Sequence, residues 1–187
     1  MKPAGMLLTP GAGSDRNHPC LVEMEQAVAP MPVERHDFPY RRSGRKAPDR
    51  GPVLVADVVE AAQAFVKNAG IKPSALVLGG RSMGGRICSM AVAEGLPAAG
   101  LVLISYPLHP PGKPDNLRIE HFPKLDVPCL FVSGTRDAFG APDELAEHIT
   151  AINGPVTHVT VEGAGHDLKG KGEFVVGTVL DWLKTIT

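Results

Sequence analysis

The pentapeptide Gly-Arg-Ser-Met-Gly around Ser82 can carry nucleophilic chemistry. It follows the apolar run Ala75 to Leu78 and opens a segment with helical periodicity. A Gly-x-Ser-x-Gly turn between a strand and a helix strains the serine backbone, and its glycines let the two backbones pass closely. The hydroxyl then stands at the edge of the sheet, where the positive end of the helix favours developing negative charge. Taken alone, the pentapeptide is also compatible with a serine that merely caps a helix.

A serine nucleophile needs a base, and the base needs an acid that orients it. Asp137 follows the apolar run Cys129 to Ser133, and His166 follows the run Thr157 to Val161. The carboxyl ends of parallel strands meet at one edge of a sheet, where sites assemble. Taken singly, Asp137 is compatible with a helix cap and His166 with a loop histidine. Their chain order after Ser82 is the one this topology requires, so the three together predict a catalytic triad.

Backbone amides are the second requirement, because acyl transfer passes through a tetrahedral oxyanion. Met83, the residue after the serine, is expected to supply one N–H group. The loop Thr9 to Ser14 is expected to supply another, from Ala12 or, as second choice, Gly13. A phosphate-cradling loop is excluded because the G-x-G-x-x-G spacing is absent: Arg16 stands where the third glycine would be.

Short apolar runs alternate with longer segments of helical periodicity, which is typical of a parallel sheet covered by helices on both faces. The expected strands are Met6 to Thr9, Val33 to Asp37, Ala75 to Leu78, Gly100 to Ser105, Cys129 to Ser133 and Thr157 to Val161. The expected helices are His18 to Ala29, Val53 to Asn68, Ser82 to Ala93, Pro142 to Ala151 and Gly172 to Thr185. The pattern predicts an α/β fold of about six mostly parallel strands.

Two proline-rich stretches, Pro39 to Pro52 and Pro107 to Pro123, are expected to be loops. The second lies at the position where a lid would be inserted, and its prolines stiffen a loop but cannot form a helical cap. We therefore expect no cap domain and a shallow, solvent-open cleft bordered by Tyr40, Leu108 and Phe139.

Arginines stand beside the candidate site in the sequence, at Arg81, Arg86 and Arg136. They fit recognition of a carboxylate or phosphate on the substrate, and they equally fit solvated or structural ion pairs. Arg81 is our candidate substrate contact among them. His109 is compatible both with the pocket lining and with a plain loop histidine.

Length and charge limit the classes of protein that this chain can represent. The 187 residues are room for one domain, residues 1–187, and 19 basic against 20 acidic side chains leave a net charge of −1. We therefore expect no nucleic acid partner. No apolar stretch approaches the roughly 18 residues of a membrane span, and the N-terminus lacks a signal-peptide pattern. We expect a soluble, cytoplasmic protein without membrane partner; its oligomeric state is not indicated.

The cysteines give no sign of a metal or disulfide framework. Cys20, Cys88 and Cys129 are an odd number without C-x-x-C spacing. We accordingly expect no metal and no organic cofactor.

Motifs that cover nearly the whole chain carry a family resemblance. They are Thr9-Pro10-Gly11-Ala12-Gly13, Phe38-Pro39-Tyr40, Gly79-Gly80-Arg81-Ser82-Met83-Gly84-Gly85-Arg86, Ser105-Tyr106-Pro107-Leu108-His109-Pro110, Gly134-Thr135-Arg136-Asp137 and Gly165-His166. On these motifs the chain resembles the α/β-hydrolases, and within them the small, capless KANL3/Tex30-like group, with dienelactone-hydrolase-like proteins as more distant relatives. The resemblance implies Ser82, Asp137 and His166 as nucleophile, acid and base. It departs at Pro10, where many relatives have histidine. The dienelactone group uses a cysteine nucleophile, whereas Cys88 is expected here to be a core thiol.

The expected function is hydrolysis of a small-molecule ester or thioester through an acyl-enzyme intermediate. The alternative is an interaction scaffold that keeps the fold with little or no turnover, since a fold does not entail a function. Three intact site residues argue against the scaffold, which has no need of them.

Overall fold

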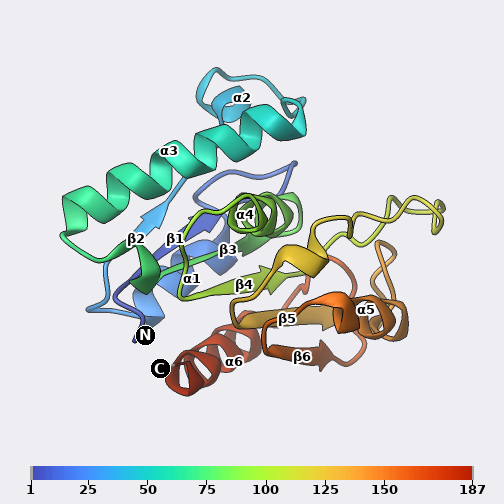
Figure 1. Cartoon of the computed structure of the whole chain (residues 1–187). Helices are drawn as coiled ribbons and strands as arrows, with labels where there is room; N and C mark the ends of the chain where they lie inside the picture. The colour runs from blue at the N-terminus through green and yellow to red at the C-terminus, as the bar shows by residue number, and fades with distance from the viewer. Residues whose placement is uncertain (1, 187) are drawn as a thin grey trace.

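Six parallel strands form one sheet in the order β2-β1-β3-β4-β5-β6 in the computed structural model, which describes residues 2–186 (Figure 1). The strands are β1 (Gly5–Thr9), β2 (Val33–Arg35), β3 (Leu76–Arg81), β4 (Gly100–Ile104), β5 (Cys129–Gly134) and β6 (Val156–Val161). All five neighbouring pairs are parallel. The predicted fold class is confirmed.

Helices cover both faces of this sheet (Figure 1). They are α1 (Pro19–Ala27), α2 (Pro39–Arg42), α3 (Gly51–Ala69), α4 (Met83–Ala93), α5 (Pro142–His148) and α6 (Gly172–Thr185). Successive residues of β1 serve the two faces in turn, as a pleated strand requires. Leu7 belongs to the core beneath α3 and α4, whereas Met6 and Leu8 pack with residues of α1 and α6. The core therefore consists of two apolar layers separated by the sheet.

The first proline-rich stretch is not simply the loop that the sequence predicts. Pro39–Arg42 forms α2, and α3 already begins at Gly51, so that Pro39 and Pro52 each occupy the first turn of a helix. Proline is tolerated there because the N–H group it lacks would have no partner within the helix. The expectation of a loop is thus wrong at both ends of this stretch.

The second proline-rich stretch is irregular and projects from one end of the molecule (Figure 1). It contains several hydrogen-bonded turns and ends in the short 3₁₀ helix Phe122–Lys124. Within residues 2–186, no cap domain covers the sheet, as the sequence predicts. None of the helices within residues 2–186 combines the length and apolar character needed to cross a bilayer.

The register of the sheet brings the candidate loops to a common edge. Thr9 at the end of β1 pairs with Gly80, and Arg81 at the end of β3 pairs with Ile104. At the other side of the sheet Gly134 pairs with Val161. The segments that follow β1, β3, β5 and β6 all leave the sheet at its carboxyl edge, which is where sites form in open parallel sheets.

The contact between β1 and α4 generates a test of this packing. A Cβ atom on Gly84 would lie 2.5 Å from the Thr9 carbonyl oxygen, whereas one on Gly177 in α6 would meet nothing within 4 Å. Gly84→Ala should lower the free energy of unfolding by about 1–3 kcal/mol through overpacking. The control Gly177→Ala should raise it by about 0.5–1 kcal/mol, since alanine restricts the unfolded chain. Urea unfolding followed by circular dichroism measures both, and a Gly84→Ala protein as stable as the wild type would contradict the described packing.

Candidate active site

Ser82 stands in a strained turn between β3 and α4. Its backbone has φ 53° and ψ −121°, a conformation that residues other than glycine rarely adopt. The Ser82 N–H donates to the Ile104 carbonyl oxygen at 2.8 Å, which extends the pairing of β3 with β4. Gly80 and Gly84 flank the turn without room for a Cβ atom, because the Thr9 carbonyl and hydroxyl oxygens contact both glycines. The glycines of the motif therefore allow the close crossing that holds Ser82 in place.

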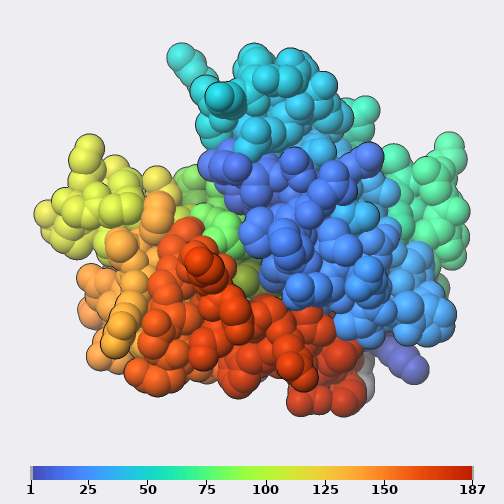
Figure 2. Space-filling model, turned by 180° about the vertical axis from the view of Figure 1, so that it is seen from behind, coloured from blue at the N-terminus to red at the C-terminus, as the bar shows by residue number. Residues whose placement is uncertain are grey.

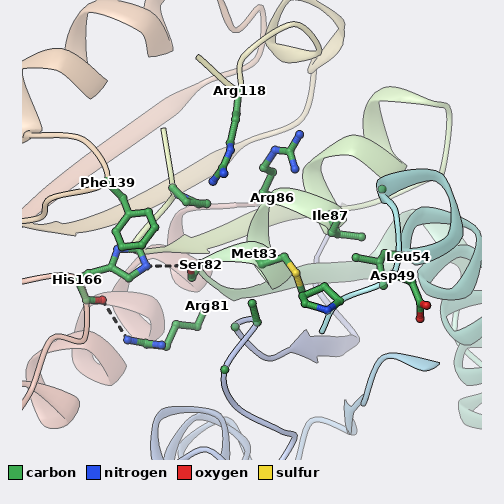
Figure 3. A pocket seen from close by; sticks show the side chains of 16 residues that line it. Asp49, Leu54, Arg81, Ser82, Met83, Arg86, Ile87, Arg118, Phe139 and His166 are labelled. Carbon is green, nitrogen blue, oxygen red and sulfur yellow. Dashed lines mark hydrogen bonds between the residues drawn. The ribbon is translucent and has the colours of Figure 1, made fainter. Parts of the chain in front are cut away.

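His166 joins Ser82 and Asp137 in one chain of polar contacts, of which Figure 3 shows the contact between His166 and Ser82. The Nε2 atom of His166 lies 2.8 Å from Ser82 Oγ, and Nδ1 lies 2.9 and 2.8 Å from the two carboxylate oxygens of Asp137. An ionised carboxylate only accepts hydrogen bonds, so Nδ1 carries the proton and Nε2 accepts from the serine hydroxyl. The structure thus brings together the three residues that the sequence predicts as a site.

Backbone contacts between two loops fix the distance from Asp137 to His166. The Arg136 N–H donates to the Ala164 carbonyl oxygen at 2.9 Å, and the Gly163 N–H donates to Thr135 Oγ1 at 2.8 Å. A Cβ atom on Gly134 would collide with the Ala164 carbonyl, so a glycine is needed where β5 meets the His166 loop. The acid and the imidazole are therefore positioned by the main chain.

Phe139 and Arg81 hold the imidazole from two further directions. The Phe139 ring stacks on the His166 ring with centroids 4.0 Å apart. The backbone N–H of Phe139 donates to Asp137 Oδ1 at 2.8 Å. Arg81 donates from Nη2 to the His166 carbonyl oxygen at 3.1 Å (Figure 3). The Asp137 side chain is 1% exposed and that of His166 is 19% exposed, so the acid is shielded while the base reaches the cavity.

Three backbone N–H groups close to Ser82 have no acceptor among residues 2–186: those of Ala12, Gly13 and Met83. The loop that carries the first two packs directly on the serine, since a Cβ atom on Gly11 would lie 3.5 Å from Ser82 Cβ. Met83 begins α4, and the N–H groups of a first helical turn have no partner within the helix. This set of unpaired donors is what an oxyanion would require.

Tyr40 supports the Ala12 loop from the core. It is fully buried, and its hydroxyl donates to the Ala12 carbonyl oxygen at 2.9 Å. Burial raises the pKa of this hydroxyl, so it stays protonated and remains a donor. Arg41 adds a hydrogen bond from Nε to the Ser14 carbonyl oxygen at 2.8 Å.

A cavity of about 450 Å³ opens above Ser82. Its walls come from the loop after β1, the start of α3, the turn at Ser82 with the beginning of α4, and the loops that carry Phe139 and His166. Figure 2 shows the corresponding recess, where green atoms lie between the blue N-terminal segment, the yellow-green loop and the orange segment near residue 165. A volume of this size suits a small organic ligand.

The cavity lining corrects part of the predicted substrate contacts. Phe139 and Arg81 line it, but Tyr40, Leu108 and His109 do not. Tyr40 and Leu108 are fully buried, and Gly140 packs against Leu108. His109 is 6% exposed, with Nε2 3.5 Å from a carboxylate oxygen of Glu144. Tyr40 and Leu108 point into the core because apolar burial there outweighs exposure on a cleft wall, whereas His109 lies beside Glu144 outside the cavity lining.

Arg118 and Asp49 line the cavity, although no pattern in the sequence predicts that they do. Both lie in the proline-rich stretches, where no strand or helix period indicates which way a side chain points. Their charge is the only signal that the sequence holds. Arg86, which the sequence places beside the candidate site without assigning it a role, also lines the cavity.

Cys88 is a core thiol, as the sequence predicts. It is fully buried in α4, contacts Thr9 Oγ1 at 3.4 Å, and burial raises its pKa to about 12. A thiol that stays protonated is a poor nucleophile. Among residues 2–186, no three His, Cys, Asp or Glu side chains are grouped as metal ligands.

A twisted parallel sheet with a serine on a strand-to-helix turn at its carboxyl edge defines the α/β-hydrolase class. The family model described as "Alpha/beta hydrolase domain" matches residues 2–175, and the chain belongs to this family.

Solved structures show the same fold at low sequence identity. A dienelactone hydrolase from Anabaena variabilis aligns with a TM-score of 0.78 and 17% identity, over 98% of this chain and 87% of that one. Est1E from Butyrivibrio proteoclasticus aligns with a TM-score of 0.77 and 13% identity, over 98% and 88%. TT1662 from Thermus thermophilus aligns with a TM-score of 0.73 and 19% identity, over 98% and 90%. At these identities the likeness concerns the fold.

The Tyr40 hydrogen bond generates the second prediction. Tyr40→Phe removes only the hydroxyl that holds the Ala12 carbonyl, so it should lower the free energy of unfolding by about 0.5–1.5 kcal/mol. It should also speed hydrogen exchange of the Ser14 amide, which donates to the Gly11 carbonyl oxygen. Tyr106→Phe is the matched control, since the Tyr106 hydroxyl donates to the Arg118 carbonyl oxygen. Hydrogen exchange followed by mass spectrometry distinguishes the two. Equal exchange of the Ser14 amide in both variants would show that Tyr40 does not support this loop.

Proposed function

We propose that this protein is a serine hydrolase that cleaves a small ester or thioester through an acyl-enzyme intermediate. The observation that carries the proposal is the continuous contact from Asp137 through His166 to Ser82 Oγ at the base of a ligand-sized cavity. Family membership supports it. A cytoplasmic location and membership of the KANL3/Tex30-like group stay predictions from the sequence.

In the proposed reaction Ser82 Oγ attacks the substrate carbonyl carbon while His166 Nε2 takes the hydroxyl proton. The tetrahedral intermediate collapses, and His166 returns the proton to the departing oxygen or sulfur. Water then gives a proton to His166, attacks the acyl-enzyme carbonyl, and Ser82 leaves with the proton from His166. Asp137 holds the imidazole in the required tautomer and stabilises the imidazolium that forms in each half-reaction.

The oxyanion of each tetrahedral intermediate would be held by the N–H groups of Met83 and Ala12, with Gly13 as the next donor in the same loop. The support is that these donors have no acceptor among residues 2–186. Preorganised donors of this kind stabilise developing charge without reorganisation, and removing one costs roughly 10²–10³ in kcat. Substrate contacts would come from the cavity lining, including Phe139.

Ser82→Ala tests the nucleophile. The variant should lose covalent labelling by a fluorophosphonate probe and lose turnover of p-nitrophenyl acetate by roughly 10⁶. Ser43→Ala serves as control, because Ser43 is exposed and its hydroxyl contacts only the Pro39 and Tyr40 carbonyl oxygens and the exposed Arg45 side chain. Intact-mass spectrometry reads the labelling. A Ser82→Ala protein that still labels would refute the assignment, and a folded wild type that neither labels nor turns over esters would favour the scaffold.

Asp137→Asn tests the acid. The carboxamide would donate to Nδ1 and leave the imidazole proton on Nε2, where it cannot accept from Ser82, so kcat should fall by roughly 10⁴. Asp167→Asn is the matched control, since Asp167 is exposed and hydrogen-bonds Lys169 N–H. Both variants remove one carboxylate charge close to His166. Equal activity of the two variants would show that the contact at 2.8 Å is not needed for turnover.

A further inference from the structure

Two arginine side chains converge beside Ser82 without a counter-ion. Figure 3 shows the guanidinium groups of Arg86 and Arg118 on one side of Ser82, with Arg81 on the opposite side. Arg86 comes from the first turn of α4 and Arg118 from the proline-rich stretch after β4, and both line the cavity. Segments 32 residues apart in the sequence thus place two cations over one site.

Neither guanidinium has a partner within the part of the chain that the structure describes. No carboxylate of residues 2–186 lies within ion-pair distance of Arg86 or Arg118, and neither side chain donates a hydrogen bond there. The Nε atom of Arg86 is buried and unpaired. Asp49, the acidic residue in the cavity lining, already binds Arg45 at 2.8 Å.

Burial and the positive charge of Arg86 together lower the pKa values of two neighbouring side chains, Arg118 and His121. Burial, and then the positive charge of Arg86, lower the pKa of Arg118. The same two causes lower the pKa of His121 to about 4, so this imidazole is neutral and adds no further cation. Two like charges that are partly desolvated and unpaired are costly unless a ligand supplies the opposite charge.

We propose that Arg86 and Arg118 form an anion-binding subsite beside Ser82, and that the substrate is an ester or thioester carrying a carboxylate or phosphate group. Guanidinium groups bind such oxyanions with paired N–H donors, which fixes orientation as well as charge. The inference rests on the proposed function for the reacting bond, but the subsite itself stands on the two arginines. Arg81 has a different role, because its guanidinium binds the His166 carbonyl oxygen.

The kinetic test uses ester pairs that differ only in charge. One pair is the p-nitrophenyl monoester of adipic acid and its primary amide, which places the anion on the acyl side. The other is 4-acetoxybenzoate and 4-acetoxybenzamide, which places it on the leaving group. For each pair the ratio of kcat/KM, anionic over neutral, is measured in the wild type, Arg86→Gln and Arg118→Gln.

The ratio should fall by about tenfold or more in Arg86→Gln and in Arg118→Gln for at least one pair, because each variant loses a charged hydrogen bond to the anion. The control is Arg136→Gln, which removes the same charge from an exposed arginine outside the cavity lining and should keep the wild-type ratio. The pair that responds tells which side of the ester carries the anion. Circular dichroism confirms that each variant is folded.

A binding test separates the subsite from the chemistry. Monomethyl adipate, its primary amide and inorganic phosphate are titrated calorimetrically into Ser82→Ala protein, with and without Arg86→Gln. The acid or phosphate should bind at least about tenfold more tightly than the amide, and the difference should shrink in Arg86→Gln and at high salt.

Equal ratios in all four proteins, together with equal affinity for acid, amide and phosphate, would overturn the subsite. Arginine-dependent binding to the Ser82→Ala protein, together with a wild type that fails to label with fluorophosphonate, would instead keep the subsite and reject the serine hydrolase. The two proposals therefore fail in different experiments.

Discussion

The Thr9 carbonyl oxygen lies too close to Gly80 and Gly84 for either residue to carry a Cβ atom. The geometry around Ser82 follows from this contact. The end of β1, the end of β3 and the first turn of α4 meet there, with the Thr9 hydroxyl packed against both glycines. The chain can cross from β3 into α4 at this point only through a sharp turn, and Ser82 absorbs it at φ 53°. Strain of this kind costs on the order of 1–3 kcal/mol. Hydrogen bonds from Ser82 N–H to Ile104 and from Thr9 Oγ1 to Gly79 accompany the strained turn on both neighbouring strands.

The half of the site that carries Asp137 and His166 also depends on a glycine in close contact with a backbone carbonyl group. Gly134 has no room for a side chain because the Ala164 carbonyl packs against it, and backbone hydrogen bonds then tie the Asp137 loop to the His166 loop. The imidazole is held by main-chain geometry, the Phe139 ring and the Arg81 guanidinium. Two glycine-mediated contacts, one on each side, therefore set the distances that place His166 between Ser82 and Asp137.

The sequence suffices to predict the sheet and the three polar residues because both leave local signals. Buried parallel strands appear as short apolar runs, and the predicted helix Gly172 to Thr185 agrees with α6 at both ends. Ser82, Asp137 and His166 each follow such a run, and the parallel topology then brings them to one edge. The proline-rich stretches leave no such signal, since they have neither strand nor helix periodicity. Tyr40 and Leu108 are therefore buried in the core, although the sequence predicts them at a cleft wall. Arg118 lines the cavity, and no sequence pattern predicts this position.

Arginines of the same chemistry differ here only in what surrounds them. Arg81 donates a hydrogen bond to the His166 carbonyl oxygen. Arg136 is exposed, so that water can solvate its charge. Arg86 and Arg118 face the cavity, where desolvation weakens screening and strengthens their mutual repulsion. No carboxylate within residues 2–186 lies within ion-pair distance of either guanidinium. The missing counter-charge must then come from solvent ions or from a ligand, and a ligand that supplies it gains affinity beside the same hydroxyl that His166 contacts.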